Sequence, residues 1–212
     1  EKMAKAVFTT DGSYKPLFDH IKEAGGADLA EKICAESNAA YERLVNSDHT
    51  DLNNTAKMHW KQCCERAAIY TTVRKYYPES VLEWINESLE KFGLNAAAAL
   101  NRIMRFPGMK ALFLPIMRSM AKSMFGSKGG FRNQFGLVTK QEVHFDILEC
   151  PYCKYMKELD CPELGPGFCK SDEYSYGNLR DFTFERTQTL AIGGEKCDFC
   201  MRRNSSIVGK TT

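Results

Sequence analysis

The chain has 212 residues, of which 43% are hydrophobic and 26% are charged, and its formal net charge is +2. This composition is typical of a soluble globular protein. The length is sufficient to bury a core as one large domain or two small ones. No stretch resembles a secretory signal or a membrane span, so we expect a cytoplasmic protein without stable membrane insertion.

The charge is unevenly distributed along the chain. The segment from Lys91 to Gln141 holds nine of the 29 Lys and Arg residues and none of the 27 Asp and Glu residues. Such an asymmetry suggests an anionic ligand, an anionic surface or the acidic part of the chain itself as the partner of this segment. Few aromatic residues interleave with these charges and no recognition motif is present, so we expect no nucleic-acid partner.

Hydrophobic residues at spacings of three and four predict that the first half of the chain is helical. Gly25-Gly26 and Gly93 are expected to end helices, and the glycine-containing stretch 126–136 is expected to be a loop and an internal boundary. The predicted helices cover residues 14–24, 28–44, 51–76, 81–92, 95–105 and 109–125.

After Gly136 the hydrophobic period changes. Residues 142–149 alternate between apolar and polar, which predicts a half-buried strand. A second strand is expected over 181–192, a turn over 193–196 and a returning strand over 197–203, with helical pieces near 152–158 and 162–169. The predicted fold class is therefore α+β, with short helices beside a small antiparallel sheet. The expected divisions are a helical N-terminal region (1–136), a cysteine-rich catalytic or ligand-binding region (137–204) and a loose tail (205–212).

Six of the nine cysteines lie in the last third of the chain, and four of them form the Cys-x-x-Cys pairs Cys150–Cys153 and Cys197–Cys200. Without an export signal, grouped cysteines indicate metal, nucleophile or redox chemistry rather than disulfides. Two such pairs resemble a zinc ribbon, but within a strand Cys197 and Cys200 point to opposite faces. We therefore expect that the two pairs do not bind one metal. The first pair also resembles the redox motif of thioredoxin-like proteins, although the βαβ pattern around that motif is missing.

Cys169 and Asp172 stand one helical turn apart, just after Gly165-Pro166-Gly167, so both side chains lie on one helix face. Cys169 is a candidate nucleophile or metal ligand, and Asp172 a candidate base or orienting group. A buried cysteine beside a capping aspartate is the structural alternative. Arg186, on an apolar strand face, requires a buried anion from the protein or from a ligand. His144, the one histidine of the last third, is either structural or the partner of a cysteine.

Four pieces of the last third, taken in order, resemble a known family. They are a strand that ends at Cys150, Phe168-Cys169-x-x-Asp172, Glu185-Arg186-x-x-x-Leu190-Ala191 and Gly193-Gly194-x-x-Cys197-Asp198-Phe199. In this order and spacing they resemble the L-2-amino-thiazoline-4-carboxylic acid hydrolases. The resemblance implies a hydrolase that opens a small cyclic amidine at a C–N or C–S bond to give a carbamoyl-cysteine-type product. The same region is distantly similar to the small-molecule-binding domains named after vinyl reductase. That similarity implies the alternative of a ligand- or metal-binding sensor without turnover.

The resemblance also assigns roles to individual residues. It implies that Cys169 and Cys197 are nucleophile candidates. It implies that Asp172 and Asp198 are acid–base or orienting groups. Arg186, together with His144, is expected to bind the carboxylate of a small-molecule substrate. We expect the last third of the chain to contain one shared pocket. Cys169, Asp172, Arg186 and Cys197, which all belong to matching pieces, are expected to surround it.

Attack by a water molecule that a divalent metal activates is an equally open alternative to attack by a thiolate. Its candidate ligands are Cys150, Cys169 and Cys197. Assembly into a homo-oligomer is also left open by the sequence.

Overall fold

The computed structural model of the chain describes residues 6–47, 49 and 51–205, so that all but the first residue of the tail expected over 205–212 lies outside the described residues. In chain order its elements are α1 (Lys15–Val45), α2 (Asn54–Val73), α3 (Val81–Ile103), α4 (Met109–Ser123), β1 (Arg132–Val138), β2 (Glu142–Glu149), α5 (Pro151–Glu158), α6 (Gly165–Tyr176), β3 (Phe182–Glu185) and β4 (Cys197–Arg203). Short 3-10 turns occupy Ser127–Gly129, Pro162–Leu164 and Leu190–Ile192. The predicted α+β class is confirmed, since a helical first half precedes a small antiparallel sheet with short helices. None of the described helices is apolar over a length that could cross a bilayer.

The four strands form one antiparallel sheet in the order β1-β2-β4-β3. In its central pair, Phe145 lies opposite Phe199 and His144 lies opposite Cys200. Side chains alternate along a strand, so this register collects the apolar side chains of β2 and β4 on one face, here called the inner face, and polar ones on the outer face. The alternation predicted for residues 142–149 is confirmed by their burial. Cys197 and Cys200 lie on opposite faces, as the strand parity predicts.

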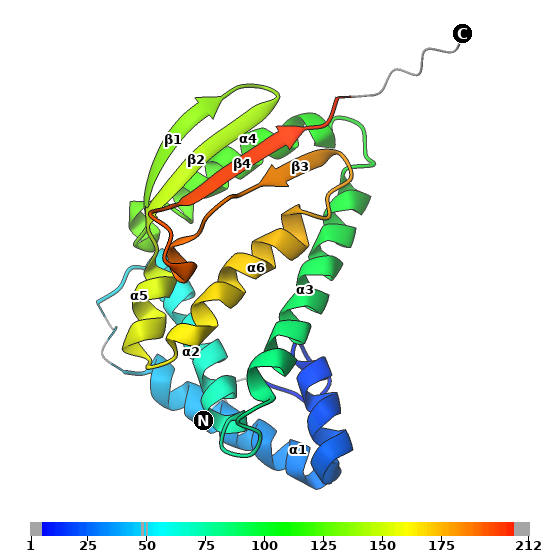
Figure 1. Cartoon of the computed structure of the whole chain (residues 1–212), viewed down its shortest axis with the longest axis vertical. Helices are drawn as coiled ribbons and strands as arrows, with labels where there is room; N and C mark the ends of the chain where they lie inside the picture. Colours follow the sequence, from blue (N-terminus) through cyan, green and yellow to red (C-terminus); the bar gives the residue numbers. More distant parts are fainter. Residues whose placement is uncertain (1–5, 48, 50, 206–212) are drawn as a thin grey trace.

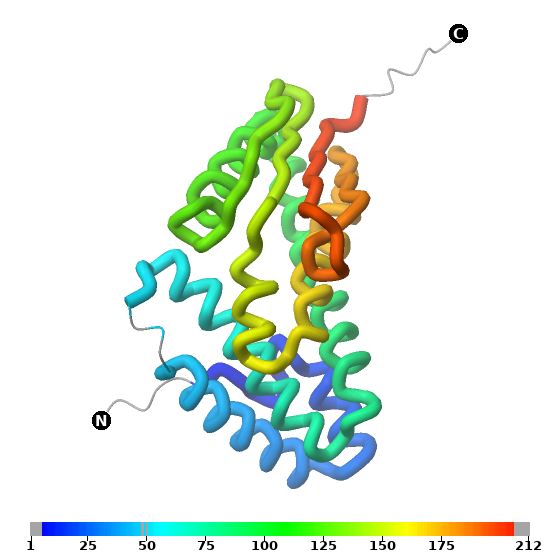
Figure 2. Tube along the Cα trace, turned by 60° about the vertical axis from the view of Figure 1, so that its left-hand side comes forward, coloured from blue at the N-terminus to red at the C-terminus, as the bar shows by residue number. Residues whose placement is uncertain are grey.

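Two hydrophobic clusters fill the protein. The first joins α1, α2 and the start of α3 to α5 and the beginning of α6. The second packs the end of α3 and α4 against the inner face of the sheet. In Figure 1, the sheet and α4 lie at one end of the molecule and α1 and α2 at the other, with α3 and α6 running between them. Figure 2 shows β2 leading directly into α5, so the central strand ends at the helical half of the protein.

Of the helix ends predicted at glycines, the one at Gly25-Gly26 is found as a break in α1, and the one at Gly93 is not found. α1 is interrupted at Gly26, whose φ of 85° and ψ of 170° are not helical and suit a residue without a Cβ. Gly93 does not end a helix, because α3 continues through it to Ile103. A Cβ at Gly93 would lie 2.5 Å from the Cβ of Tyr174 in α6. The absence of a side chain at Gly93 therefore serves the close packing of α3 against α6, which local sequence does not reveal.

Two further predictions need correction. The stretch 126–136 is not one loop, because a 3-10 turn is followed there by β1, which pairs with β2. The strand expected over 181–192 ends at Glu185. Beyond it, one carboxylate oxygen of Asp198 accepts the N–H groups of Thr187 and Gln188, both at 2.9 Å. These donors are thereby removed from the strand ladder. A 3-10 turn and Gly193, with a φ of 88°, then make the turn expected at 193–196.

Candidate active site

A cavity of about 580 Å³ lies between the helices and the inner face of the sheet. Its wall is built by α2, α3, α4 and α6 and by residues of β2 and β4. The volume falls in the range of small-molecule sites. Its lining includes four thiols, two arginines and two carboxyl groups, which belong to Cys150, Cys153, Cys169, Cys197, Arg66, Arg186, Glu65 and Asp172. The structure thus brings together the four residues that were expected to share a cavity.

Cys169 and Cys197 reach this cavity from different elements. Helix α6 begins at Gly165 with Pro166 in its first turn, where proline is well tolerated. Cys169 therefore lies in the second turn of α6 and not at its N-terminus. Cys197 is the first residue of β4, and its Sγ accepts the N–H of Leu190 at 3.3 Å.

The surroundings of Cys169 favour its thiolate. A hydrogen bond with Cys197 is the largest influence and lowers the pKa of Cys169 from 9.0 to about 6, with Thr189 and the charge of Arg186 acting in the same direction against burial. The same hydrogen bond, together with burial, raises the pKa of Cys197. The buried hydroxyl of Thr189 has no hydrogen-bond partner among the described residues, so it is free to donate to the Cys169 thiolate. Cys169 is thus the reactive sulfur of the pair and Cys197 its donor.

Asp172 lies one turn along α6 and is bound to Arg186. The guanidinium of Arg186 donates to Asp172 at 3.2 Å, to Glu173 at 2.7 Å and to the carbonyl oxygen of Cys169 at 2.8 Å. The side chain of Arg186 is only 1% exposed, whereas that of Asp172 is 34% exposed, on the wall of the cavity. Burial raises the pKa of Asp172 from 3.8 to about 7, although the charge of Arg186 opposes the rise. Near neutral pH the site therefore combines a thiolate with a carboxyl group that can still hold a proton.

Arg66 is a site residue that the sequence analysis missed. It lies on α2, and its guanidinium stacks on the ring of Phe168 at 3.5 Å and approaches the hydroxyl of Ser171 at 3.4 Å. Its Nη1 is buried and, in the part of the chain that the structure describes, has no hydrogen-bond partner. Burial lowers the pKa of Arg66, and Tyr14 and other neighbours counteract this effect. The position of an arginine beside the apolar stripe of an amphipathic helix was the signal that could have revealed it.

Cys150 and Cys153 also line the cavity, but they form a separate pair. Cys150 is the N-cap residue of α5 and Cys153 lies in its first turn. A hydrogen bond from Cys150 lowers the pKa of Cys153, and the same bond with burial raises the pKa of Cys150. Among the described residues, three metal-binding side chains converge to within 4.8 Å at another place, on the outer face of the sheet. The metal ligand set expected at Cys150, Cys169 and Cys197 is therefore corrected, because their sulfurs do not converge in this way.

His144 and Asp198 do not reach the cavity. Both line a second hollow, of about 390 Å³, on the outer face of the sheet. Asp198 is occupied with the backbone of residues 187–188 and accepts the hydroxyl of Thr187 at 2.5 Å. It is a turn-stabilising residue here. Strand parity explains both placements. His144 precedes Phe145 and Asp198 precedes Phe199, and because Phe145 and Phe199 point to the inner face, the residues before them point to the outer face.

The fold and the cavity define a small α+β protein in which a thiol of lowered pKa and a carboxyl group of raised pKa line a cavity of the size of small-molecule sites. Residues 57–201 match the family of L-2-amino-thiazoline-4-carboxylic acid hydrolases. This match covers most of the chain, and the chain belongs to that family.

A search among curated proteins found no match to the chain. Among solved structures, the chain is similar to an Fe(II) unliganded H-NOX protein from K. algicida, with 10% identity, a TM-score of 0.36 and coverage of 92% of this chain and 96% of that one. A point mutant of that protein gives a TM-score of 0.33 at the same identity and coverage. Scores this low support no inference about ligands or fold.

Replacing Thr189 with valine is expected to raise the pKa of Cys169, because it removes a hydroxyl that donates to the thiolate. The measurement is the pH dependence of the alkylation of Cys169 by iodoacetamide, followed by peptide mass spectrometry. The parent is expected to show a midpoint near pH 6. Thr187→Val is the matched control, because that hydroxyl donates to Asp198 on the outer face. A parent midpoint close to the ordinary thiol value of 9.0 would contradict the assignment.

Proposed function

We propose that this protein is a cysteine-dependent hydrolase that opens 2-amino-thiazoline-4-carboxylate, or a close cyclic amidine, to give a carbamoyl-cysteine-type product. The observation that carries the proposal is the placement of Cys169 and Asp172 on one wall of the cavity, with the thiol acidic and the carboxyl weakly acidic. Membership of the hydrolase family supports the reaction class. A cavity of about 580 Å³ is ample for one such ring.

The first step is attack by the Cys169 thiolate on the ring carbon between nitrogen and sulfur. A new C–S bond forms to the enzyme while the ring C–S bond breaks. The ring sulfur leaves as a thiol and takes its proton from Asp172, which starts protonated because its pKa is raised. The enzyme is left linked through sulfur to an isothiourea.

The second step is hydrolysis of that intermediate. Asp172, now a carboxylate, accepts a proton from water as the water oxygen adds to the same carbon. The Cys169 thiolate leaves, the C–S bond to the enzyme breaks, and the added oxygen becomes the carbonyl of the carbamoyl group. The low pKa of Cys169 makes it a good leaving group as well as a nucleophile at neutral pH. Cys197 can donate a hydrogen bond to the sulfur in both roles.

Recognition of the substrate carboxylate is assigned to Arg66 rather than to Arg186. Arg186 is nearly unexposed and its two terminal nitrogens already contact two carboxylates and a carbonyl oxygen, so that only its Nε has no partner among the described residues. Arg66 lines the same cavity with an unpartnered guanidinium nitrogen. A carboxylate placed there would supply the missing acceptor and form a charge-assisted pair. Arg186 is then a positioning residue, which holds Cys169 and Asp172 in place on α6.

Cys169→Ser is expected to lower ring opening by roughly 10³-fold or more, because the nucleophile and leaving group are lost. The assay incubates purified protein with 2-amino-thiazoline-4-carboxylate and detects the product by mass spectrometry. Cys34→Ser is the matched control. The Cys34 thiol donates to the carbonyl of Phe8 at 3.3 Å and accepts from the side-chain amide of Asn38 at 3.8 Å, and a hydroxyl can do both. Both variants should melt near the parent temperature. A parent that binds the ring tightly but never opens it would instead favour a sensor, and full activity in Cys169→Ser would rule out the covalent route.

The pH dependence of kcat/KM is expected to be a narrow bell. Activity should rise as Cys169 loses its proton near pH 6 and fall as Asp172 loses its proton near pH 7, the apparent values belonging to the pair. Asp172→Asn should reduce kcat by about 10²–10⁴-fold and remove the high-pH decline. Glu173→Gln, which alters another partner of Arg186, should retain both limbs. A high-pH decline that persists in Asp172→Asn would assign the proton donor elsewhere.

Arg66→Gln is expected to raise KM by roughly 10- to 100-fold, which corresponds to a lost charged hydrogen bond of about 1.5–3 kcal/mol. The change in kcat should be smaller. The matched control is a substrate instead of a variant: 2-aminothiazoline without the carboxylate should be processed equally by parent and Arg66→Gln. An equal loss with both substrates would show that Arg66 acts on the fold of the cavity and not on the carboxylate.

A further inference from the structure

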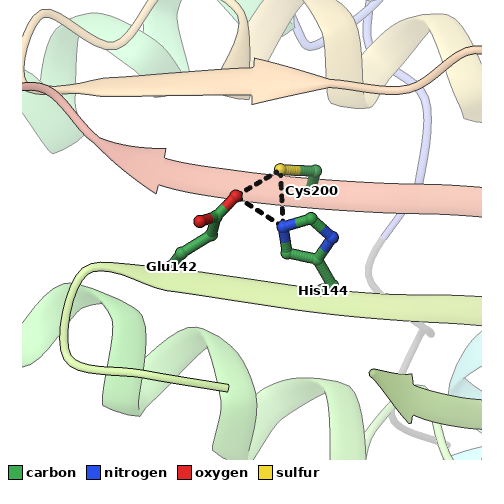
Figure 3. A group of neighbouring side chains, drawn as sticks. All are labelled: Glu142, His144 and Cys200. Atoms are coloured by element: carbon green, nitrogen blue, oxygen red, sulfur yellow. Dashed lines mark hydrogen bonds and ion pairs between the residues drawn. The ribbon is translucent and has the colours of Figure 1, made fainter. Parts of the chain in front are cut away.

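Three side chains of different chemistry converge on the outer face of the sheet, away from the cavity described above. Glu142 and His144 stand two positions apart on β2, and Cys200 is the cross-strand partner of His144 on β4. Strand alternation places all three on one face. Figure 3 shows them pointing toward one another across the two strands. Their position is fixed by the register of the central strand pair and not by a loop.

The three polar atoms form a compact triangle. His144 Nε2 lies 2.5 Å from Glu142 Oε1 and 3.2 Å from Cys200 Sγ, and the sulfur lies 3.5 Å from the same carboxylate oxygen. Both contacts of the imidazole are made by one nitrogen. A Cys–His–Glu proton relay would use the two ring nitrogens separately. The arrangement is therefore not that of a catalytic triad.

A metal ion explains the convergence better than hydrogen bonds do. Zinc binds cysteine sulfur at about 2.3 Å and histidine nitrogen or carboxylate oxygen at about 2.0–2.2 Å, so a tetrahedral ion separates its ligand atoms by roughly 3.3–3.6 Å. The two distances to sulfur already agree with this geometry within a few tenths of an ångström. Only the nitrogen–oxygen distance has to widen, by rotation of the Glu142 carboxylate.

The charges around the triangle also suit a divalent cation. Arg202 donates to Glu142 at 2.7 Å and approaches Glu185 at 3.4 Å. Glu185 is the cross-strand neighbour of Cys200 on β3, so it lies on the same face. With Cys200 as a thiolate, the three anionic groups exceed the one arginine by two charges, which a divalent ion neutralises. Arg202 contacts the same carboxylate oxygen that the ion would bind, so the two cations compete for it.

We propose that Glu142, His144 and Cys200 form a zinc-binding site on the outer face of the sheet, separate from the hydrolase cavity. Nitrogen, sulfur and oxygen together are ligands that zinc accepts and that magnesium or calcium do not favour. Three protein ligands leave the fourth position to water or to the carboxylate of Glu185. Because two ligands come from β2 and one from β4, the bound ion also clamps the central strands.

The test uses the purified 212-residue chain, freed of metal with a chelator and titrated with Zn²⁺ alone in competition with a chromophoric chelator. The parent is expected to bind one zinc per chain and to melt at a higher temperature when it is bound. Cys200→Ala and His144→Gln should each weaken binding by more than about 100-fold, since even residues beyond the ligands contribute 10- to 100-fold. Co²⁺ in place of Zn²⁺ should give the parent a thiolate-to-cobalt absorption band that Cys200→Ala lacks.

The controls separate this site from the cavity thiols and from general unfolding. Cys169→Ala should bind zinc as the parent does. His144 is 38% exposed, so His144→Gln remains informative where Cys200→Ala loses its fold. Arg202→Ala should bind zinc more tightly, because the competing cation is gone, whereas Arg203→Ala on the opposite parity of β4 should not.

A parent that fails to compete with the chelator would overturn the proposal. Loss of the zinc or of the cobalt band in Cys169→Ala, with both retained in Cys200→Ala, would do so as well. Ring opening is measured independently of these titrations, so either proposal can fail while the other stands.

Discussion

Arg186 extends from the end of β3 into the protein, where its guanidinium contacts two carboxylates and the carbonyl oxygen of Cys169. The side chain is almost completely buried, so its charge is compensated within the protein and not by water. Because Asp172 and Glu173 are partly exposed and Arg186 is not, it is the guanidinium that would be left as an uncompensated buried charge if both carboxylates were lost. The same contact stabilises the Cys169 thiolate and opposes the rise of the pKa of Asp172. The attachment of β3 to α6 and the electrostatics of the site therefore depend on one cation.

Because side chains alternate along each strand, the sheet presents different functional groups on its two faces. Its inner face contributes Cys197 and Phe199 to the cavity with the acidic thiol. Its outer face carries Asp198, Cys200 and His144, each of which is the sequence neighbour of a residue on the inner face. A one-residue shift of the register would exchange these sets. The register that builds the hydrophobic core thus also keeps the proposed zinc ligands and the cavity thiols on opposite faces of the sheet.

The cavity combines features that the proposed ring opening requires. The carbon under attack needs a nucleophile that is ionised at neutral pH, and the departing sulfur needs a proton. Cys169 and Asp172 meet these needs because a sulfur hydrogen bond lowers one pKa and burial raises the other. Their acidities are reversed relative to the usual order of a thiol and a carboxylic acid. Arg66, from the helical half, adds a cation on the same cavity, so the proposed site spans both hydrophobic clusters instead of residing in the cysteine-rich region alone.

The sequence by itself determined the features that depend on local periodicity. The change from helical spacing to alternation gave the α+β class, the inward side of β2 and the opposite orientation of Cys197 and Cys200. Applied to Asp198 and His144, the same parity rule would have placed both outside the cavity, but the family resemblance grouped them with Cys169. Tertiary structure alone decided the rest. Gly93 is required by the approach of Tyr174 from α6, the anions required by Arg186 come from α6, and Arg66 joins the site from a helix about a hundred residues earlier. These are contacts between segments distant in sequence, which no local pattern encodes, because a side chain's partner is chosen by packing and by the burial of charge.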